Sequence, residues 1–383
     1  MPENWNPFKS STDVTTLDAE LLKQEIGKRF PFYDMKFNLT TVAFFIRVDE
    51  RTLENNFESL RISLSKKGYI PMLRFEQGES LIYVVQKPNI KKKSIWVNIL
   101  LLIATVFTTT LAGSLQWVSI HNQTWVLDAS LTDILYKSLT LPYLLEGLIY
   151  FSIPLLMILG IHEMGHYFLS KRHKLDTSLP FFIPVPPPFI LGTLGALIHT
   201  REPIPNRKAL LDVGISGPIF GFIIAIVVSV IGLFLMQINP VYAISNGGEI
   251  TVMYPLLLQG LSNFFTIPNT AIMHPTLFAG WVGFFLTAVN LLPIGQLDGG
   301  HVIRALLKDK QKYVSWAMVI LIFGLSFLYT GWLIFAFIIL FLIGTSHQPP
   351  LNEYSPLDTK RKILGIIALI IFIVCFAPIP MSV

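Results

Sequence analysis

Long uncharged apolar stretches alternate with short charged segments over most of this chain. Residues 95–114 carry no charged side chain, and about 20 apolar residues are enough for a helix to cross a bilayer. Residues 1–92 differ, because their short runs have helical or alternating periodicity. We therefore expect a small soluble α+β domain over 1–92 and a membrane domain over 93–383.

The uncharged stretches predict about seven membrane-spanning helices. The expected spans are 95–114, 147–170, 213–236, 275–297, two short spans within 314–345, and 363–379. Thr330-Gly331 interrupts the 314–345 stretch, which is longer than one span requires. We expect two short spans there, and a single longer one is the alternative.

The soluble domain is expected to contain helices and strands but no catalytic centre. The predicted elements are helices at Asp18–Lys28 and Thr52–Lys67, the latter closed by Gly68, and strands at Val42–Val48, Tyr69–Leu73 and Ser80–Gln86. This part of the chain has neither metal-ligand spacing nor a phosphate-binding loop. We therefore assign it no chemistry.

Composition agrees with a multi-pass membrane protein. The chain is 52% hydrophobic and 14% charged, with a mean hydropathy of +0.58. Its formal net charge is only +5, and the basic residues cluster beside apolar runs. That distribution is typical of charges that set membrane topology, so we expect no nucleic-acid partner. The single cysteine, Cys375, excludes a disulfide within the chain.

Charge asymmetry predicts the orientation in the membrane. Lys91–Lys93 precede the first span and Lys171–Lys174 follow the second, whereas 237–274 has neither lysine nor arginine. Positive charges favour the cytoplasmic side. We expect the N-terminus to lie in the cytoplasm. The first residues lack the basic start and apolar core of a secretory signal, so we expect a prokaryotic cell-membrane protein whose first span directs insertion.

A proline-rich apolar segment separates the second and third expected spans. Leu179–His199 contains five prolines followed by Gly192-Thr193-Leu194-Gly195, which is too much proline for a spanning helix. Irregular backbone at membrane depth persists only where it packs on protein or lines a wet cavity. We expect a re-entrant loop or short β-hairpin near the active site. Its edge, with Gly192, Thr193 and Gly195, would bind extended substrate, and tight glycine packing is the alternative.

The segment His162-Glu163-Met164-Gly165-His166 ends the second expected span. Histidines four residues apart lie on one helical face, where both rings can bind one Zn²⁺ ion. Glu163 is then placed to act as general base toward a water at the metal. Zinc needs a third protein ligand.

Asp298 is the best candidate for the third zinc ligand. It follows the fourth expected span, in a segment that begins at Asn290 and ends in Gly299-Gly300. Both Asp298 and the two histidines end inward-running spans, so we expect them at a similar depth near the cytoplasmic face. Asn290, eight residues or about two helical turns earlier, is positioned to donate to a developing oxyanion. Its alternative role is to tie helices together.

Together these motifs resemble the site-2 protease family, the M50-type intramembrane zinc metalloproteases. The resemblance rests on HEMGH, the Gly192–Gly195 segment, GPIFG at Gly217–Gly221 and NLLPIGQLDGGH, and covers roughly 145–310. It implies that His162, His166 and Asp298 bind zinc, that Glu163 is the catalytic base and that Asn290 assists. It also implies single-span membrane proteins as substrates. The N-terminal domain and extra C-terminal spans are most similar to the EGY-type archaeal, cyanobacterial and plastid branch.

Other residues have simpler interpretations. Gly217 and Gly221 have the small-xxx-small spacing of helix packing, and His301 is close enough to Asp298 to support the ligands. The loop histidines are expected to have no catalytic role. The alternative function is a zinc-binding membrane protein without peptidase activity, either a transporter or an inactive scaffold. A transporter should show repeated halves with paired polar sites, which this sequence does not.

Overall fold

The computed structural model describes residues 18–38, 40–88, 94–244, 251–268 and 270–382. It divides into two compact units. The N-terminal unit contains Met1–Lys92 together with Pro203–Lys208 and Pro349–Pro356. The helical unit contains the remaining segments, Lys93–Glu202, Ala209–Gln348 and Leu357–Val383. The two inserted segments of the N-terminal unit extend it beyond the expected 1–92.

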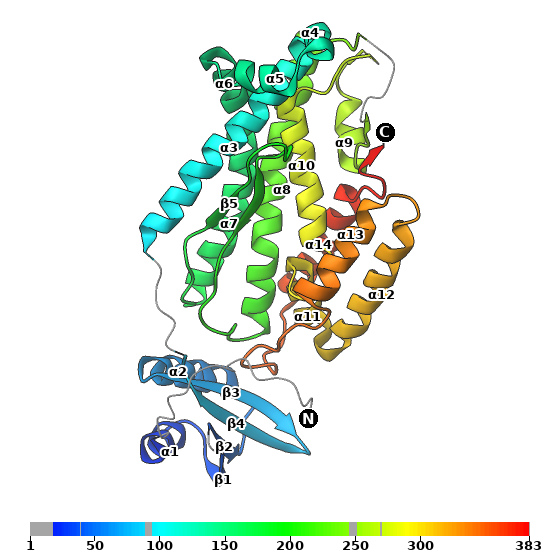
Figure 1. Cartoon of the computed structure of the whole chain (residues 1–383). Helices are drawn as coiled ribbons and strands as arrows, with labels where there is room; N and C mark the ends of the chain where they lie inside the picture. The colour runs from blue at the N-terminus through cyan, green and yellow to red at the C-terminus, as the bar shows by residue number, and fades with distance from the viewer. Residues whose placement is uncertain (1–17, 39, 89–93, 245–250, 269, 383) are drawn as a thin grey trace. The chain divides into compact units, whose positions relative to one another are not determined.

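The N-terminal unit is an antiparallel sheet with two helices. Its elements are α1 (Ala19–Gly27), β1 (Phe32–Asn38), β2 (Thr41–Ile46), α2 (Leu53–Lys66), β3 (Tyr69–Glu76) and β4 (Glu79–Gln86), with strand order β1-β2-β4-β3 (Figure 1). Alternate residues of β2 enter the core, as period-two patterning requires. The apolar face of α2, with Phe57, Leu60 and Leu64, is buried in the same core. Strand β1 was not among the predicted elements.

The two inserted segments complete the open edge of β3. The backbone N–H of Leu73 donates to Leu351 O at 2.8 Å, and Leu351 N–H donates to Ile204 O at 2.9 Å. The Leu351 side chain is buried in the core of the unit. Lys208 Nζ donates to both carboxylate oxygens of Glu54 at 2.8 and 2.7 Å. The sheet edge is therefore paired by residues distant in the sequence.

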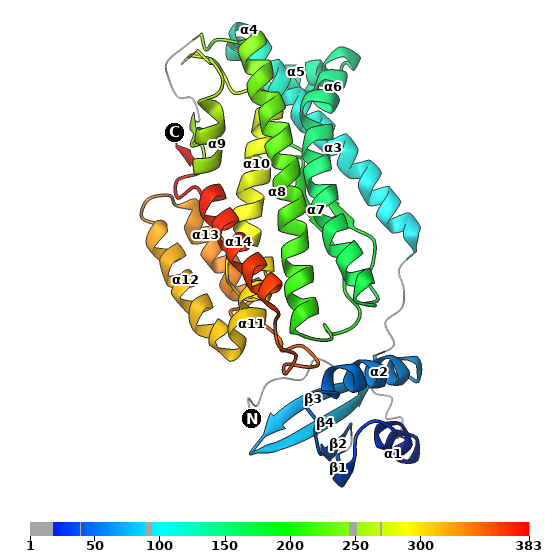
Figure 2. The ribbon, with the colours of Figure 1, turned by 180° about the vertical axis from the view of Figure 1, so that it is seen from behind.

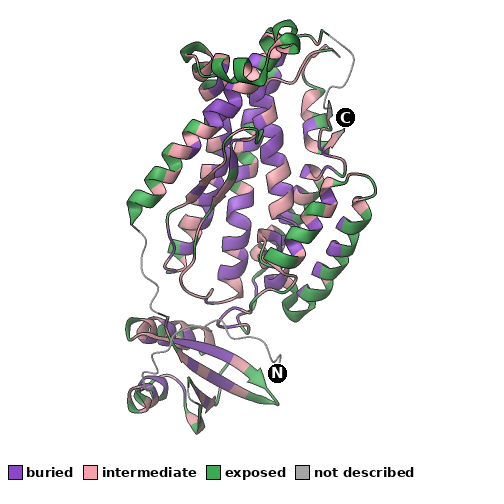
Figure 3. Ribbon diagram, in the orientation of Figure 1, coloured by how far each residue is buried: buried purple, intermediate pink, exposed green. Residues whose placement is uncertain are grey.

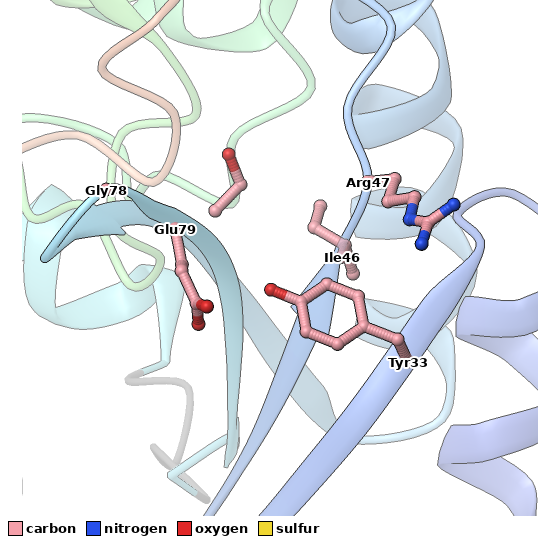
Figure 4. Close-up of a pocket in the computed structure, with 6 residues that line it drawn as sticks. Tyr33, Ile46, Arg47, Gly78 and Glu79 are labelled. Carbon is pink, nitrogen blue, oxygen red and sulfur yellow. The ribbon is translucent and has the colours of Figure 1, made fainter.

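A shallow hollow opens at the end of the sheet where β1 and β2 lie next to the β3–β4 turn. It is lined by Tyr33, Ile46, Arg47, Gly78, Glu79 and Ser80 (Figure 4). Tyr33 and Glu79 interact through their side chains. None of the lining residues is a histidine or cysteine, so this hollow offers no zinc-ligand set.

Three helices of the helical unit are long and apolar enough to cross a membrane. They are α3 (Ile95–His121), the continuous run Leu141–Arg172 and α8 (Arg207–Ile238). The second run comprises α6 (Leu141–Gly147), a π-helical turn η1 (Leu148–Ser152) and α7 (Ile153–Arg172). Among the described residues, three helical runs thus have the length and the apolar composition of a membrane span.

The other expected spans are also helical but shorter. The remaining helices are α4 (Gln123–Asp128), α5 (Leu131–Ser138), α9 (Leu256–Ser262), α10 (Pro275–Asn290), α11 (Asp298–Leu307), η2 (Lys308–Lys310), α12 (Gln311–Leu325), α13 (Gly331–Ile338), η3 (Ile339–Ile343) and α14 (Thr359–Cys375). Two helices, α12 and α13, occupy most of the 314–345 stretch. The count of seven spans remains a prediction.

Helices α8 and α10 form much of the interior of the helical unit, whereas α3 and α12 have many exposed apolar side chains (Figure 3). Small residues permit the close approach of α8 and α10. A Cβ on Gly280 would overlap Ser229, and one on Gly232 would overlap Leu277. Close helix contact through small residues is the usual packing mode in membranes.

An ion-pair cluster joins α8 to α14 and to the end of α7, which lie side by side in Figure 2. Asp212 accepts from Arg361 Nε at 2.8 Å and from Arg361 Nη2 at 2.6 Å. His173 Nε2 lies 2.9 Å from Asp212 Oδ2. Asp358 also pairs with Arg361. Asp212 therefore links three helices of the unit.

Two short antiparallel strand pairs complete the helical unit. β5 (Phe181–Pro184) pairs antiparallel with β6 (Thr193–Leu197), and β7 (Thr251–Val252) pairs with β8 (Met381–Ser382). The first pair lies in the segment where a re-entrant loop or β-hairpin was predicted. It packs on α3 and α7.

Candidate metal centre

The helical spacing of His162 and His166 brings their rings together on α7. Both residues are buried, with relative exposures of 7% and 6%. Their Nε2 atoms lie 3.2 Å apart, each directed to the same point. One turn of helix therefore supplies two metal-binding nitrogens.

Asp298 reaches the two histidines from the start of α11, whereas it was expected at the end of the fourth span. α10 ends at Asn290, and Asp298 is the first residue of α11. The expected span to 297 is therefore wrong at its C-terminal end. Pro293 cannot continue a helix, and Gly295 adopts a positive φ of 48°. Asn290 and Asp298 consequently lie on two sides of a turn and not two turns apart on one helix.

The three side chains form a set whose geometry fits zinc. Asp298 Oδ2 lies 3.4 Å from His162 Nε2 and 3.2 Å from His166 Nε2. Tetrahedral zinc with bonds of about 2.0–2.2 Å places neighbouring ligand atoms about 3.3 Å apart. Two imidazoles and one carboxylate also match the ligand chemistry of catalytic zinc, which keeps one position for water. His162, His166 and Asp298 are thus suited to hold Zn²⁺.

Residues of α8 fix the orientation of the histidine ligands. His166 Nδ1 lies 2.8 Å from Val213 O, so this nitrogen carries the proton and Nε2 keeps its lone pair for the metal. A Cβ on Gly217 would overlap the His166 ring, and one on Gly221 would lie 3.0 Å from His162 Nδ1. The packing role expected for these two glycines is therefore directed at the ligands themselves.

Glu163 lies between the histidines and is also buried, with 8% exposure. The backbone N–H of Ile198 lies next to its carboxylate. Ile198 directly follows β6, so the strand runs past the general-base candidate. This contact brings the HEMGH helix and the predicted substrate strand together.

Asn290 ends α10 next to the same ligands. Its Nδ2 lies 3.3 Å from His162 Nε2, on the metal-facing side of the ring. An amide N–H at this place is able to reach an oxygen bound beside the metal. The structure thus brings together all five residues predicted for zinc binding and catalysis.

The three predicted substrate-strand residues have different surroundings. Gly192 has a φ of 70°, and a Cβ there would overlap the backbone of Thr108 on α3. Thr193 is buried, and its hydroxyl donates to Ile183 O at 2.9 Å. Gly195 has a φ of 102° and, among the described residues, no atom within 4 Å of a Cβ position. Gly195 is the one of the three with open space beside it.

Other histidines lie outside the ligand set. The His301 and His347 rings are in edge contact, with centroids 4.4 Å apart, and His301 Nδ1 lies 3.0 Å from Leu297 O. His301 also packs against Gly214 on α8. His173 pairs with Asp212, and His274 caps α10 by accepting from Thr276 N. These contacts give them structural roles.

Sequence reasoning missed two backbone groups that contact the site residues. Val213 O orients His166, and Ile198 N–H contacts Glu163. Main-chain donors and acceptors are present at almost every residue, so no residue type distinguishes them. The proline-rich segment before Ile198 was the available signal for a strand at this place.

A buried His-His-Asp set with a glutamate between the histidines matches the residue pattern of zinc metallopeptidases. Residues 150–330 match the model of peptidase family M50. The similarity of the chain extends to the EGY-type branch. The "Probable zinc metalloprotease EGY1, chloroplastic" of Oryza sativa subsp. japonica is 28% identical over 302 residues, 74% of this chain and 50% of the relative.

Two relatives from Arabidopsis thaliana show the same similarity. "Probable zinc metalloprotease EGY1, chloroplastic" is 30% identical over 231 residues, 58% of this chain and 41% of the relative. "Probable zinc metalloprotease EGY2, chloroplastic" is 26% identical over 233 residues, 59% and 41% of the two chains. The matched regions span half or less of these curated relatives. No solved structure matches the chain.

Proposed function

We propose that this protein is an intramembrane zinc metalloendopeptidase that cleaves single-span membrane proteins in or near their transmembrane segments. One observation carries the proposal: two histidines of α7 and an aspartate of α11 converge beside a buried glutamate within apolar helices. A metal-binding protein without hydrolytic activity has no need of that glutamate. The M50 family match supports the same chemistry.

The residues of the site have separate roles in peptide hydrolysis. A zinc ion held by His162, His166 and Asp298 supplies a Lewis acid that polarises water and the scissile carbonyl. Glu163 takes a proton from the attacking water while the oxygen of that water bonds to the carbonyl carbon. The same carboxyl group then gives the proton to the amine nitrogen as the C–N bond breaks. Asn290 donates to the oxygen that gains negative charge.

The β5–β6 hairpin is the proposed substrate-binding element. Its strand β6 pairs with β5 on one side, and the described residues provide no strand on the other side. An extended substrate segment placed along β6 would be led toward Glu163 by the Ile198 contact. A transmembrane helix must unwind locally to be bound in this way, which selects segments of low helix propensity.

We also propose a cell-membrane location with the N-terminus and the active site toward the cytoplasm. The lysine-rich segments at 91–93 and 171–174 and the lysine- and arginine-free 237–274 segment support this orientation. Cleavage near this face would release the product inward. Regulated intramembrane proteolysis is the process that such a reaction serves.

The decisive experiment compares Glu163→Gln with the wild-type protein. We expect purified Glu163→Gln to retain bound zinc, measured by elemental analysis, and to lose cleavage of a single-span substrate. Glu146→Gln is the matched control, because it removes a carboxylate from the same continuous helical run, outside the site. This control should cleave at the wild-type rate. Undiminished cleavage by Glu163→Gln would contradict the proposed mechanism.

The physiological substrate can be sought with the same variant. Single-span proteins that accumulate in cells carrying Glu163→Gln, compared with wild-type cells, are candidates. Zinc uptake into sealed vesicles without any peptidase activity would instead support the transporter alternative.

A further inference from the structure

The β5–β6 hairpin is too small to be stable by itself. Its strands are four and five residues long, and a bulge interrupts their register between Phe182 and Pro184. An isolated two-stranded hairpin is marginally stable at best. The position of the hairpin must therefore be set by the helices on which it packs.

Helix α3 holds the hairpin by polar side chains spaced along its length. Asn98 Nδ2 donates to the carbonyls of Leu179 at 3.0 Å and Pro180 at 2.8 Å, at the start of β5. Thr108 Oγ1 donates to Gly192 O at 2.7 Å, at the start of β6. Gln116 Nε2 donates to Ile190 O at 3.2 Å, in the connection between the strands.

The spacing of these donors suits a single helical surface. Asn98 and Gln116 are 18 residues apart, which corresponds to five full turns and the same face of the helix. Thr108 lies between them. Polar groups on an otherwise apolar helix are costly at membrane depth unless they are paired, and all three of these side chains are paired with the hairpin backbone.

The contact at Gly192 is the tightest of the three. A Cβ at Gly192 would overlap Thr108 O and the backbone of Thr109, so the hairpin backbone packs directly on the backbone of α3. Within the hairpin, Thr193 Oγ1 donates to Ile183 O at 2.9 Å and holds the two strands together. Beyond β6, Ile198 N–H contacts Glu163. These contacts form a continuous path from α3 to the general-base candidate.

We infer that α3 is the platform that positions the substrate-binding hairpin, and that Thr108 is a positioning residue for strand β6. The inference rests on the proposed function for the role of the hairpin, but its contacts are independent of catalysis. α3 lies outside residues 150–330, the region that matches the family model. The active site therefore depends on a helix that contributes no ligand and no catalytic group.

The test uses two equivalent substitutions on the same helix. Thr108→Val removes the hydroxyl that reaches Gly192, at almost constant side-chain volume. Thr105→Val is the matched control, because the Thr105 hydroxyl donates to Leu101 O of its own helix at 2.7 Å. Thr108→Ser restores the hydroxyl. The readouts are steady-state cleavage of a single-span substrate by the full chain in detergent micelles, zinc content, and hydrogen exchange of residues 181–197.

In Thr108→Val, the loss of one hydrogen bond should raise KM about 3- to 10-fold. The strand would bind the substrate and the transition state more weakly by about the same factor, so kcat would change little. We expect kcat and zinc content to stay within twofold of wild type. Exchange of the hairpin amides should increase. Thr105→Val should match wild type, and Thr108→Ser should recover most of the affinity.

Equal KM and exchange in the two valine variants would overturn the inference. Loss of zinc in Thr108→Val would also overturn it, since the platform would then support the ligands and not the strand. Asn98→Leu provides a second test at the start of β5, with the same expected change in exchange. Absence of any cleavage by the wild-type protein would refute the proposed function, whereas the exchange comparison would still decide the role of α3.

Discussion

Gly217 leaves the space that the His166 ring occupies. A Cβ at position 217 would overlap His166 Nε2, the atom that faces the other two metal ligands. The glycine is therefore required by a ligand on a neighbouring helix and not by its own backbone, which is helical. At position 217, glycine is therefore required both for the close packing of α8 on α7 and for the metal-binding position of His166.

Gly217→Ala should displace His166 and weaken zinc binding. A misplaced ligand or supporting group typically costs about 10- to 100-fold in metal affinity. Zinc competition with a chelator, monitored by elemental analysis of the purified protein, measures this change. Gly324→Ala on α12 is the matched control, since among the described residues no atom lies within 4 Å of its Cβ position. Wild-type zinc affinity in Gly217→Ala would show that α8 can move away at little cost.

Asn290→Ala should lower kcat about 100-fold while zinc stays bound. The reason is the loss of a donor to the developing oxyanion. Its Nδ2 is 3.3 Å from His162 Nε2, so the amide is at the reacting position without being one of the three ligands. Kinetics with one single-span substrate and a zinc determination separate the two effects. A lower melting temperature with unchanged kcat would instead favour a role in tying helices.

Arg361→Lys should destabilise the helical unit by about 2–4 kcal/mol. Lysine cannot reproduce the two-nitrogen contact of Arg361 with Asp212, which would leave a largely buried carboxylate poorly paired. Thermal unfolding in detergent measures the loss. Lys360→Gln, at the adjacent exposed position, is the control for the loss of a basic residue from this turn. Similar melting of both variants would show that the cluster adds little stability.

The stability of the N-terminal unit should depend on the ionised form of Glu25. Hydrogen bonds from Ser63, Lys28 and Lys67 hold the pKa of Glu25 well below its usual range, with a further contribution from Arg29. A carboxyl group whose folded pKa is depressed stabilises the fold fully above its unfolded pKa, and this contribution declines as the pH falls below that value. Protection of residues 19–86 from exchange should therefore decrease from about pH 5 downward.

Glu25→Gln isolates this contribution. We expect the variant to be less stable than wild type by about 1–2 kcal/mol near pH 7, because charged hydrogen bonds are replaced by neutral ones. The difference should shrink as the pH falls, because Glu25 becomes protonated in the unfolded chain while it stays ionised in the folded protein. Glu20→Gln is the control, because Glu20 is 85% exposed and pairs with Lys23 alone in the described contacts. A constant difference from pH 7 to pH 3 would contradict the assignment.

The shared position of His162 and His166 was predictable because their spacing is local in the sequence. Histidines four residues apart on a helix must share a face, and an aspartate within an apolar region needs a partner. The helix break before Asp298 was harder to place. Pro293 marked it, but the apolar pattern continues past Asn290 and therefore predicted a longer span. Hydrophobicity alone does not distinguish a buried turn from the end of a helix.

The soluble elements were predicted where periodicity is strong and missed where it is weak. Helices α1 and α2 and strands β2 to β4 lie close to their expected positions. Strand β1 is mostly exposed and lacks a regular alternation of buried and exposed residues, so it gave no pattern to recognise. The donors on α3 are threonine, asparagine and glutamine in an apolar helix, and their partners are backbone carbonyls that no sequence pattern specifies.

The edge of β3 has a consequence for the order in which the chain can fold. Arg74 and its acceptor Leu351 O are 277 residues apart, and the Leu351 side chain belongs to the core of the N-terminal unit. During synthesis, β3 leaves the ribosome well before Leu351. The edge of β3 therefore stays unpaired until Leu351 has also been synthesised. The N-terminal unit is thus completed only after most of the helices of the helical unit have been made.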